Sequence, residues 1–214
     1  MKVEIWSDIM CPFCYIGKRK FESALELFEH QKDIEIEWRS FQLDPSTVSQ
    51  PGKDVYSYLA ERKGQTREWS VDMHRNVVEM AKNEGLEYNF DKAVIANSFN
   101  AHRLIQMAKQ QGLGDKAEEL LFKSYFTDGK NTDDANTLAE IGEAIGLDKA
   151  AVLEMLSGDT YTNEVNQDIA EAQHIGVRGV PFFVFDRRYA ISGAQPSEAF
   201  LQTLQQAYSE SKMV

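Results

Sequence analysis

The chain has 214 residues, of which 43% are hydrophobic and 27% are charged, and its formal net charge at pH 7 is −11. This composition is typical of a globular protein and excludes a mostly disordered chain, a collagen-like chain and a disulfide scaffold. An acidic surface repels phosphates and anionic lipids, so nucleic acids and membrane surfaces are not expected partners. The sequence also lacks an apolar run of about 18 residues, the length that crosses a membrane.

The N-terminal part of the chain predicts a strand, a helix and a second strand. Residues 3–6 (VEIW) favour a strand, and Pro12 suits the first position of a helix. Apolar side chains then recur at helical spacing and predict one buried stripe, formed by Phe21, Ala24, Leu25 and Phe28. Residues 34–38 alternate as a second strand, and the proline- and glycine-containing residues 44–53 indicate a loop.

The middle of the chain favours helices, and strand patterns return near the C-terminus. Between residues 54 and 171, helix-period segments cover 66–84, 97–110, 115–126, 134–145, 148–156 and 160–174. Residues 180–185 and 189–191 then predict an antiparallel hairpin, and Pro196 opens a final helix. A block of helices between two parts of a sheet domain indicates an insertion.

The only two cysteines, Cys11 and Cys14, stand as C-x-x-C at the predicted strand–helix junction. Random placement would give this separation in roughly 1% of arrangements, so the spacing is informative. Cys11 falls at the helix cap and Cys14 one turn along, which brings the two sulfurs within reach of a disulfide. The helix N-terminus favours the thiolate of Cys11, the form that carries out thiol–disulfide exchange.

Other interpretations of the cysteine pair fit less well. A zinc site needs about four ligands, but the chain has no second cysteine pair, and its four histidines lack the spacing of zinc ligands. A structural disulfide would close too short a loop to stabilise the fold, and a helix N-terminus is a poor place for two inert thiols. We therefore expect redox chemistry, with no metal and no cofactor.

A second signal is the pair Val180-Pro181, which opens the predicted strand at 180–185. Proline cannot donate to a strand ladder, so it belongs at an edge or at a first strand position. In a chain with C-x-x-C at a strand–helix junction, we expect this X-Pro bond to be cis and to face the cysteines. The alternative is a trans proline that merely begins a strand.

Two segments, EIWSDIMCPFCYIGKRKFE and GVRGVPFFVFDRRYAISGAQP, together resemble the DsbA family of thioredoxin-fold oxidoreductases, and ANSFNAHRLIQMA resembles its FrnE-like branch. The resemblance covers the whole chain. It implies an α/β fold: a thioredoxin-like domain formed by residues 1–44 and 165–214, with an all-helical domain of residues 45–164 inserted. It also implies that Cys11 is the nucleophilic cysteine, that Cys14 is the resolving one, and that Pro181 is a cis proline preceded by Val180.

The sequence departs from the best-known members at two points. Phe13 stands where a histidine is familiar, and it cannot donate a hydrogen bond to a thiolate, which argues against a strongly oxidising enzyme. Members of the family often bury an acid beneath the cysteines. Here Glu4 is the candidate, with Ile5 as the alternative occupant of that position.

We therefore expect a thiol–disulfide oxidoreductase with catalytic Cys11 and Cys14, substrate-binding Phe13, Val180 and Pro181, and protein or small-molecule thiols and disulfides as substrates. Two alternatives stay open: a glutathione-dependent transferase or 2-hydroxychromene-2-carboxylate isomerase of the same fold, and a non-enzymatic peptide-binding role. Charges near the start of the chain do not fit a secretory signal, so we expect a cytoplasmic protein. The sequence does not indicate an oligomeric state.

Overall fold

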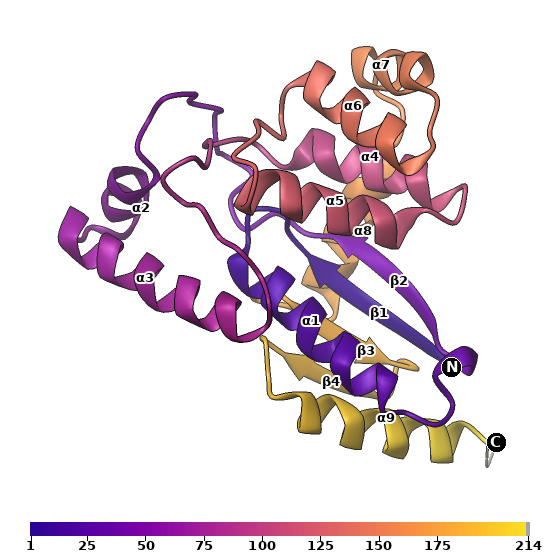
Figure 1. The fold of residues 1–214 in the computed structure, drawn as a ribbon. Helices are drawn as coiled ribbons and strands as arrows, with labels where there is room; N and C mark the ends of the chain where they lie inside the picture. Colours follow the sequence, from indigo (N-terminus) through magenta and orange to yellow (C-terminus); the bar gives the residue numbers. More distant parts are fainter. Residues whose placement is uncertain (213–214) are drawn as a thin grey trace. The chain divides into compact units, whose positions relative to one another are not determined.

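The computed structural model describes residues 1–212, in which four strands and nine α-helices alternate with loops (Figure 1). In chain order the elements are β1 (Lys2–Ser7), α1 (Pro12–Glu26), β2 (Glu35–Ser40), α2 (Val55–Lys63), α3 (Arg67–Asn83), α4 (Phe99–Lys109), α5 (Gly114–Phe126), α6 (Ala135–Ile145), α7 (Lys149–Ser157), α8 (Thr162–His174), β3 (Phe182–Phe185), β4 (Tyr189–Ser192) and α9 (Ser197–Ser211). A single 3₁₀ turn, Gln31–Asp33, precedes β2.

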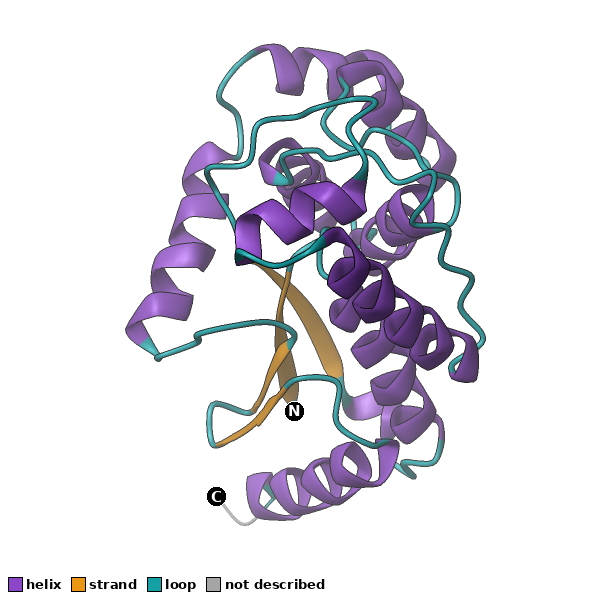
Figure 2. Cartoon of the chain, turned by 90° about the vertical axis from the view of Figure 1, so that its left-hand side faces the viewer, coloured by secondary structure: helices purple, strands orange, loops and turns teal. Residues whose placement is uncertain are grey.

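Contacts within the chain divide it into two units. Unit 1 combines residues 1–43 with residues 163–214, and unit 2 is the intervening segment 44–162. The four strands all belong to unit 1 and form one sheet in the order β2-β1-β3-β4, drawn in orange in Figure 2. Strands β1 and β2 are parallel, whereas β1–β3 and β3–β4 are antiparallel. The predicted hairpin of residues 180–191 is therefore confirmed.

Helices α1 and α9 pack together and share an aromatic core with one face of the sheet. Phe21 of α1 lies 5.5 Å from Phe183 of β3 and 5.8 Å from Phe200 of α9, measured between ring centroids. The rings of Phe183 and Phe200 are 4.6 Å apart. All three rings are almost completely buried, and each contributes about 1.5–3 kcal/mol by leaving water. This core fixes α1, and with it the cysteines, against the sheet.

The opposite face of the sheet is covered by α8. Trp6 is fully buried and packs with Val184 of β3, Ala172 of α8 and Val177 after that helix. Its indole N–H donates to the main-chain carbonyl of Asp168 at 2.9 Å. Because side chains alternate along a strand, Val3, Ile5 and Ser7 of β1 face the α1 side of the sheet.

The regular elements of unit 2 are helices, joined by loops that include one isolated bridge between Gln50 and Ile95. Its helices from α3 onward match the predicted segments, and the capping carboxylates of Asp134 and Asp148 each accept a main-chain N–H in the first turn of α6 and α7. Helix α2 was not predicted. It buries only Val55 and Ala60, so its sequence carries too weak an amphipathic pattern to be recognised.

Within residues 1–212, every helix is too short or too polar to cross a bilayer.

Candidate active site

The two cysteines lie at the start of α1, directly after β1. Cys11 is the N-cap residue, with extended backbone angles, and Pro12 occupies the first helical position. The main-chain N–H of Cys14 donates to the Cys11 carbonyl at 3.0 Å, which closes the first turn. Both thiols are free, and the residues are only 3% and 1% exposed. The predicted placement of Cys11 at the cap and Cys14 one turn later is therefore correct.

The surroundings of the two thiols differ. Burial raises the pKa of the Cys14 thiol well above its ordinary value, and the neighbouring Cys11 raises it further. The main-chain N–H of Asp8 and the hydroxyl of Ser7 act in the opposite direction, because both favour a negative sulfur. Cys14 therefore stays protonated near neutral pH.

The peptide bond between Val180 and Pro181 is cis, and it lies beside Cys11. The Cys11 thiol donates to the Val180 carbonyl at 3.4 Å. The structure thus confirms the expected cis bond and brings together Cys11, Val180 and Pro181 from opposite ends of the chain. Gly17, one turn further along α1, allows this approach: a Cβ atom there would lie 2.9 Å from Cγ of Pro181.

Phe13 and Glu4 complete the set of residues selected from the sequence. Phe13 stands between the cysteines in the first turn of α1 and is partly exposed. Glu4 is buried, but its carboxylate is paired with two arginines: Arg39 at 2.7 Å and Arg187. Glu4 alternates with Ile5 along β1, and it is Ile5 that faces the α1 side. The Glu4 carboxylate is therefore part of an ion-pair network, not an acid beneath the cysteines.

Sequence reasoning missed Ser7 and Asp8. Ser7 ends β1 and is 1% exposed, and its hydroxyl acts to lower the pKa of the Cys14 thiol. The buried Asp8 carboxylate accepts the main-chain N–H of Met10 at 3.2 Å and of Leu43 at 2.7 Å, which fixes the turn between β1 and α1. Strand alternation was the available signal for Ser7, since it puts Ser7 on the same face as Ile5.

Comparison with known proteins identifies the family. The model of the DSBA-like thioredoxin domain family matches residues 2–205 of this chain. The chain belongs to that family. Its fold is therefore α/β and thioredoxin-like with a large helical insertion, as the resemblance implied, and its activity is that of a thiol–disulfide oxidoreductase. Its substrates are thiols and disulfides.

Individual relatives span nearly the whole chain. The crystal structure of a probable DsbA oxidoreductase from Streptomyces coelicolor superposes with a TM-score of 0.92 at 39% identity, covering 98% of this chain and 91% of that one. An uncharacterized protein of Bacillus subtilis, YwbO, is 28% identical over 92% of both chains. A 2-hydroxychromene-2-carboxylate isomerase has a TM-score of 0.69 at 15% identity over 98% of this chain and 95% of that one. That likeness shows a shared fold alone.

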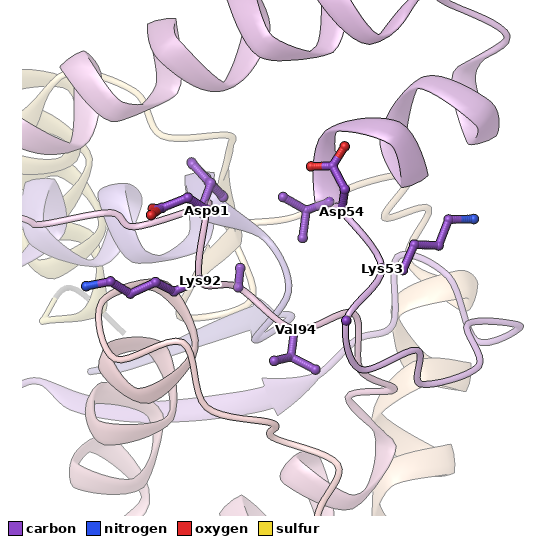
Figure 3. A pocket seen from close by; sticks show the side chains of 9 residues that line it. Lys53, Asp54, Asp91, Lys92 and Val94 are labelled. Atoms are coloured by element: carbon purple, nitrogen blue, oxygen red, sulfur yellow. The ribbon is translucent and has the colours of Figure 1, made fainter.

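A cavity of about 300 Å³ lies in unit 2 of this DSBA-like chain, between residues 52–55 and 90–94. Figure 3 shows the two segments, with the side chains of Lys53 and Lys92 extending in opposite directions. Asp54 at its rim is already engaged, because it caps α2 and pairs with Arg67 at 2.8 Å. None of the lining residues is a cysteine-site residue, so the cavity is separate from the residues that carry the redox chemistry.

Proposed function

We propose that Cys11 and Cys14 carry out dithiol–disulfide exchange, with Cys11 as the nucleophile and Cys14 as the resolving thiol. In the reducing direction, the Cys11 thiolate attacks a substrate disulfide and forms a mixed disulfide, and one substrate thiolate leaves. Cys14 then attacks Cys11 and releases the second substrate thiolate. The observation that carries this proposal is the Cys11 thiol at a helix N-cap, one turn from a second thiol and 3.4 Å from the Val180 carbonyl.

Phe13, Val180 and Pro181 are proposed to hold the substrate. Val180 offers main-chain groups beside the Cys11 sulfur, and the partly exposed Phe13 offers an apolar contact next to the same sulfur. Extended substrates, whether protein or small molecule, suit such a site because main-chain hydrogen bonding does not depend on their sequence. The net charge of −11 argues against nucleic acid as a partner.

We place the activity closer to a reductase or isomerase than to a strong oxidant. The ring of Phe13 has no group that donates to the Cys11 thiolate, so the reduced form lacks a stabilising hydrogen bond at that position. A less stable thiolate form lowers the oxidising power of the pair. The reducing cytoplasm is the compartment that fits this direction, and cell fractionation of a tagged chain checks that location.

The experiment is insulin reduction by dithiothreitol together with oxidative refolding of a reduced protein, with wild type and Cys14→Ser in parallel. Wild type is expected to accelerate insulin reduction more strongly than refolding, and Cys14→Ser is expected to lose most of the turnover because mixed disulfides then persist. Activity in neither assay, or activity unaffected by Cys14→Ser, contradicts the proposal. Tight glutathione binding with isomerase turnover would favour the isomerase alternative, whose fold the chain shares.

A further inference from the structure

Cys14 has to carry a negative charge twice in the proposed cycle. It attacks the mixed disulfide as a thiolate in one direction and leaves Cys11 as a thiolate in the other. The residue is only 1% exposed, so bulk water solvates that charge poorly. Burial alone therefore opposes both steps. A hydrogen-bond donor within the protein is needed to stabilise the Cys14 thiolate.

The end of β1 supplies such a donor. Ser7 is 1% exposed, and within residues 1–212 its hydroxyl has no hydrogen-bond partner that would compete for it. Ser7 lies on the face of β1 that α1 covers, and Cys14 stands in the first turn of α1. From this side the hydroxyl and the main-chain N–H of Asp8 both act to lower the pKa of the Cys14 thiol. A buried hydroxyl without a partner destabilises the fold that holds it, and a negatively charged sulfur at this place removes that cost.

Strand geometry explains why Ser7 is the side chain that meets Cys14. Val3, Ile5 and Ser7 share the face of β1 that α1 covers, and the first two are apolar and fully buried. Ser7 is therefore the polar side chain of β1 on that face. Glu4, which carries the carboxylate of this strand, is held by Arg39 and Arg187 instead.

We propose that Ser7 is a catalytic residue of the exchange reaction, whose hydroxyl donates a hydrogen bond to the Cys14 thiolate. This assignment rests on the proposed roles of Cys11 and Cys14. In the reducing direction, Cys14 first gives its proton to water, and its thiolate then forms the bond to the Cys11 sulfur. The bond between Cys11 and the substrate breaks, and the electron pair leaves on the substrate sulfur. Ser7 keeps its proton throughout and stabilises the charge before and during the attack.

A stopped-flow reaction with one equivalent of dithiobis(nitrobenzoate), an aromatic disulfide, separates the two cysteines in a single trace. Reduced protein releases one nitrothiobenzoate when Cys11 attacks the reagent. It releases a second when Cys14 displaces the nitrothiobenzoate held on Cys11. Ser7→Ala is expected to leave the first phase unchanged within about twofold. The second phase is expected to slow by about tenfold near neutral pH, with its pH profile moved to higher pH.

Two further variants control for structure. Ser7→Thr retains the hydroxyl and is expected to recover most of the second-phase rate. Thr132→Val removes another buried hydroxyl without a partner among the described residues, this one in unit 2, and is expected to change neither phase. In a Cys11→Ala background Cys14 is the only thiol of the chain. Thiolate absorbance against pH then checks its ionisation directly, with Ser7 and with Ser7→Ala.

The inference is overturned if Ser7→Ala leaves the rate of the second phase unchanged. It is also overturned if both phases slow equally, because that result assigns Ser7 a purely structural role. Failure of the proposed function has a different signature. Cys14→Ser would then still release two equivalents of nitrothiobenzoate, or Cys11→Ser would retain the fast first phase of release. Either result would be the same with serine or alanine at position 7.

Discussion

Arg39 of β2 connects carboxylates that come from two other elements of unit 1, β1 and α8. Its guanidinium donates to Asp168 at 2.9 Å and to Glu4 at 2.7 Å. Burial opposes the charged form, but the hydrogen bonds to Asp168 and Glu4 outweigh it, so the pKa of Arg39 is raised. Asp168 also accepts the main-chain N–H of Ser40 at 2.9 Å. A single carboxylate thus satisfies a side chain and the main chain of β2.

Asp168→Ala is expected to lower the free energy of unfolding by about 3 kcal/mol, because it leaves Arg39 and the Ser40 N–H short of a partner in a buried place. Equilibrium unfolding in urea measures the loss. The matched control is Asp72→Ala, which breaks an exposed pair with Arg75 at 2.8 Å and is expected to cost less than about 1 kcal/mol. Equal effects of the two substitutions would show that the Arg39 network does not stabilise the fold.

The position of the cis proline depends on a close approach between α1 and the loop before β3. Gly17 makes this approach possible, since a Cβ atom there would lie 2.9 Å from Cγ of Pro181 and 3.6 Å from Ala194. The Pro181 carbonyl also accepts the main-chain N–H of Gly193 at 2.8 Å. The loop is therefore held by α1 on one side and by Gly193 on the other. A side chain at position 17 would shift Pro181, and with it the Val180 carbonyl beside Cys11.

Gly17→Ala is expected to reduce kcat/KM for insulin reduction by about tenfold, because displacing a binding group by a fraction of an ångström disturbs the reacting geometry. Gly142→Ala is a matched control: its Cβ would lie 2.8 Å from Val152 within unit 2, so it creates comparable crowding among helices. Thermal unfolding checks that both variants fold. A similar loss of activity in both, in proportion to stability, would contradict the positioning role of Gly17.

The sequence predicted the elements with strong local patterns and missed those without them. The C-x-x-C pair sits where strand and helix signals meet, so its place at the α1 cap followed from Pro12 and the flanking periodicity. Helix α2 was not predicted, because it buries only two residues. Ser7 was not selected from the sequence, because its role depends on which face of β1 packs against α1. The alternation of side chains along β1 places Glu4 and Ser7 on opposite faces of the sheet, but it does not indicate which face a helix covers.

Unit 1 is assembled from the two ends of the chain. Residues 1–43 supply the cysteines and residues 163–214 supply Val180 and Pro181. Unit 2 separates these two segments in the sequence. They are joined by the pairing of β1 with β3 and by the ion pair between Arg39 and Asp168. The cysteine and proline motifs at opposite ends predicted this arrangement, which we propose as a thioredoxin-like domain interrupted by a helical one.

We propose Cys11 as the nucleophile of this thiol–disulfide oxidoreductase. The most direct measurement is alkylation of the fully reduced protein near neutral pH with less than one equivalent of iodoacetamide, followed by peptide mass spectrometry. The label is expected almost entirely on Cys11, because burial keeps Cys14 protonated while Cys11 stands at the N-cap of α1. Label distributed equally over both cysteines, or found first on Cys14, would contradict this role of Cys11.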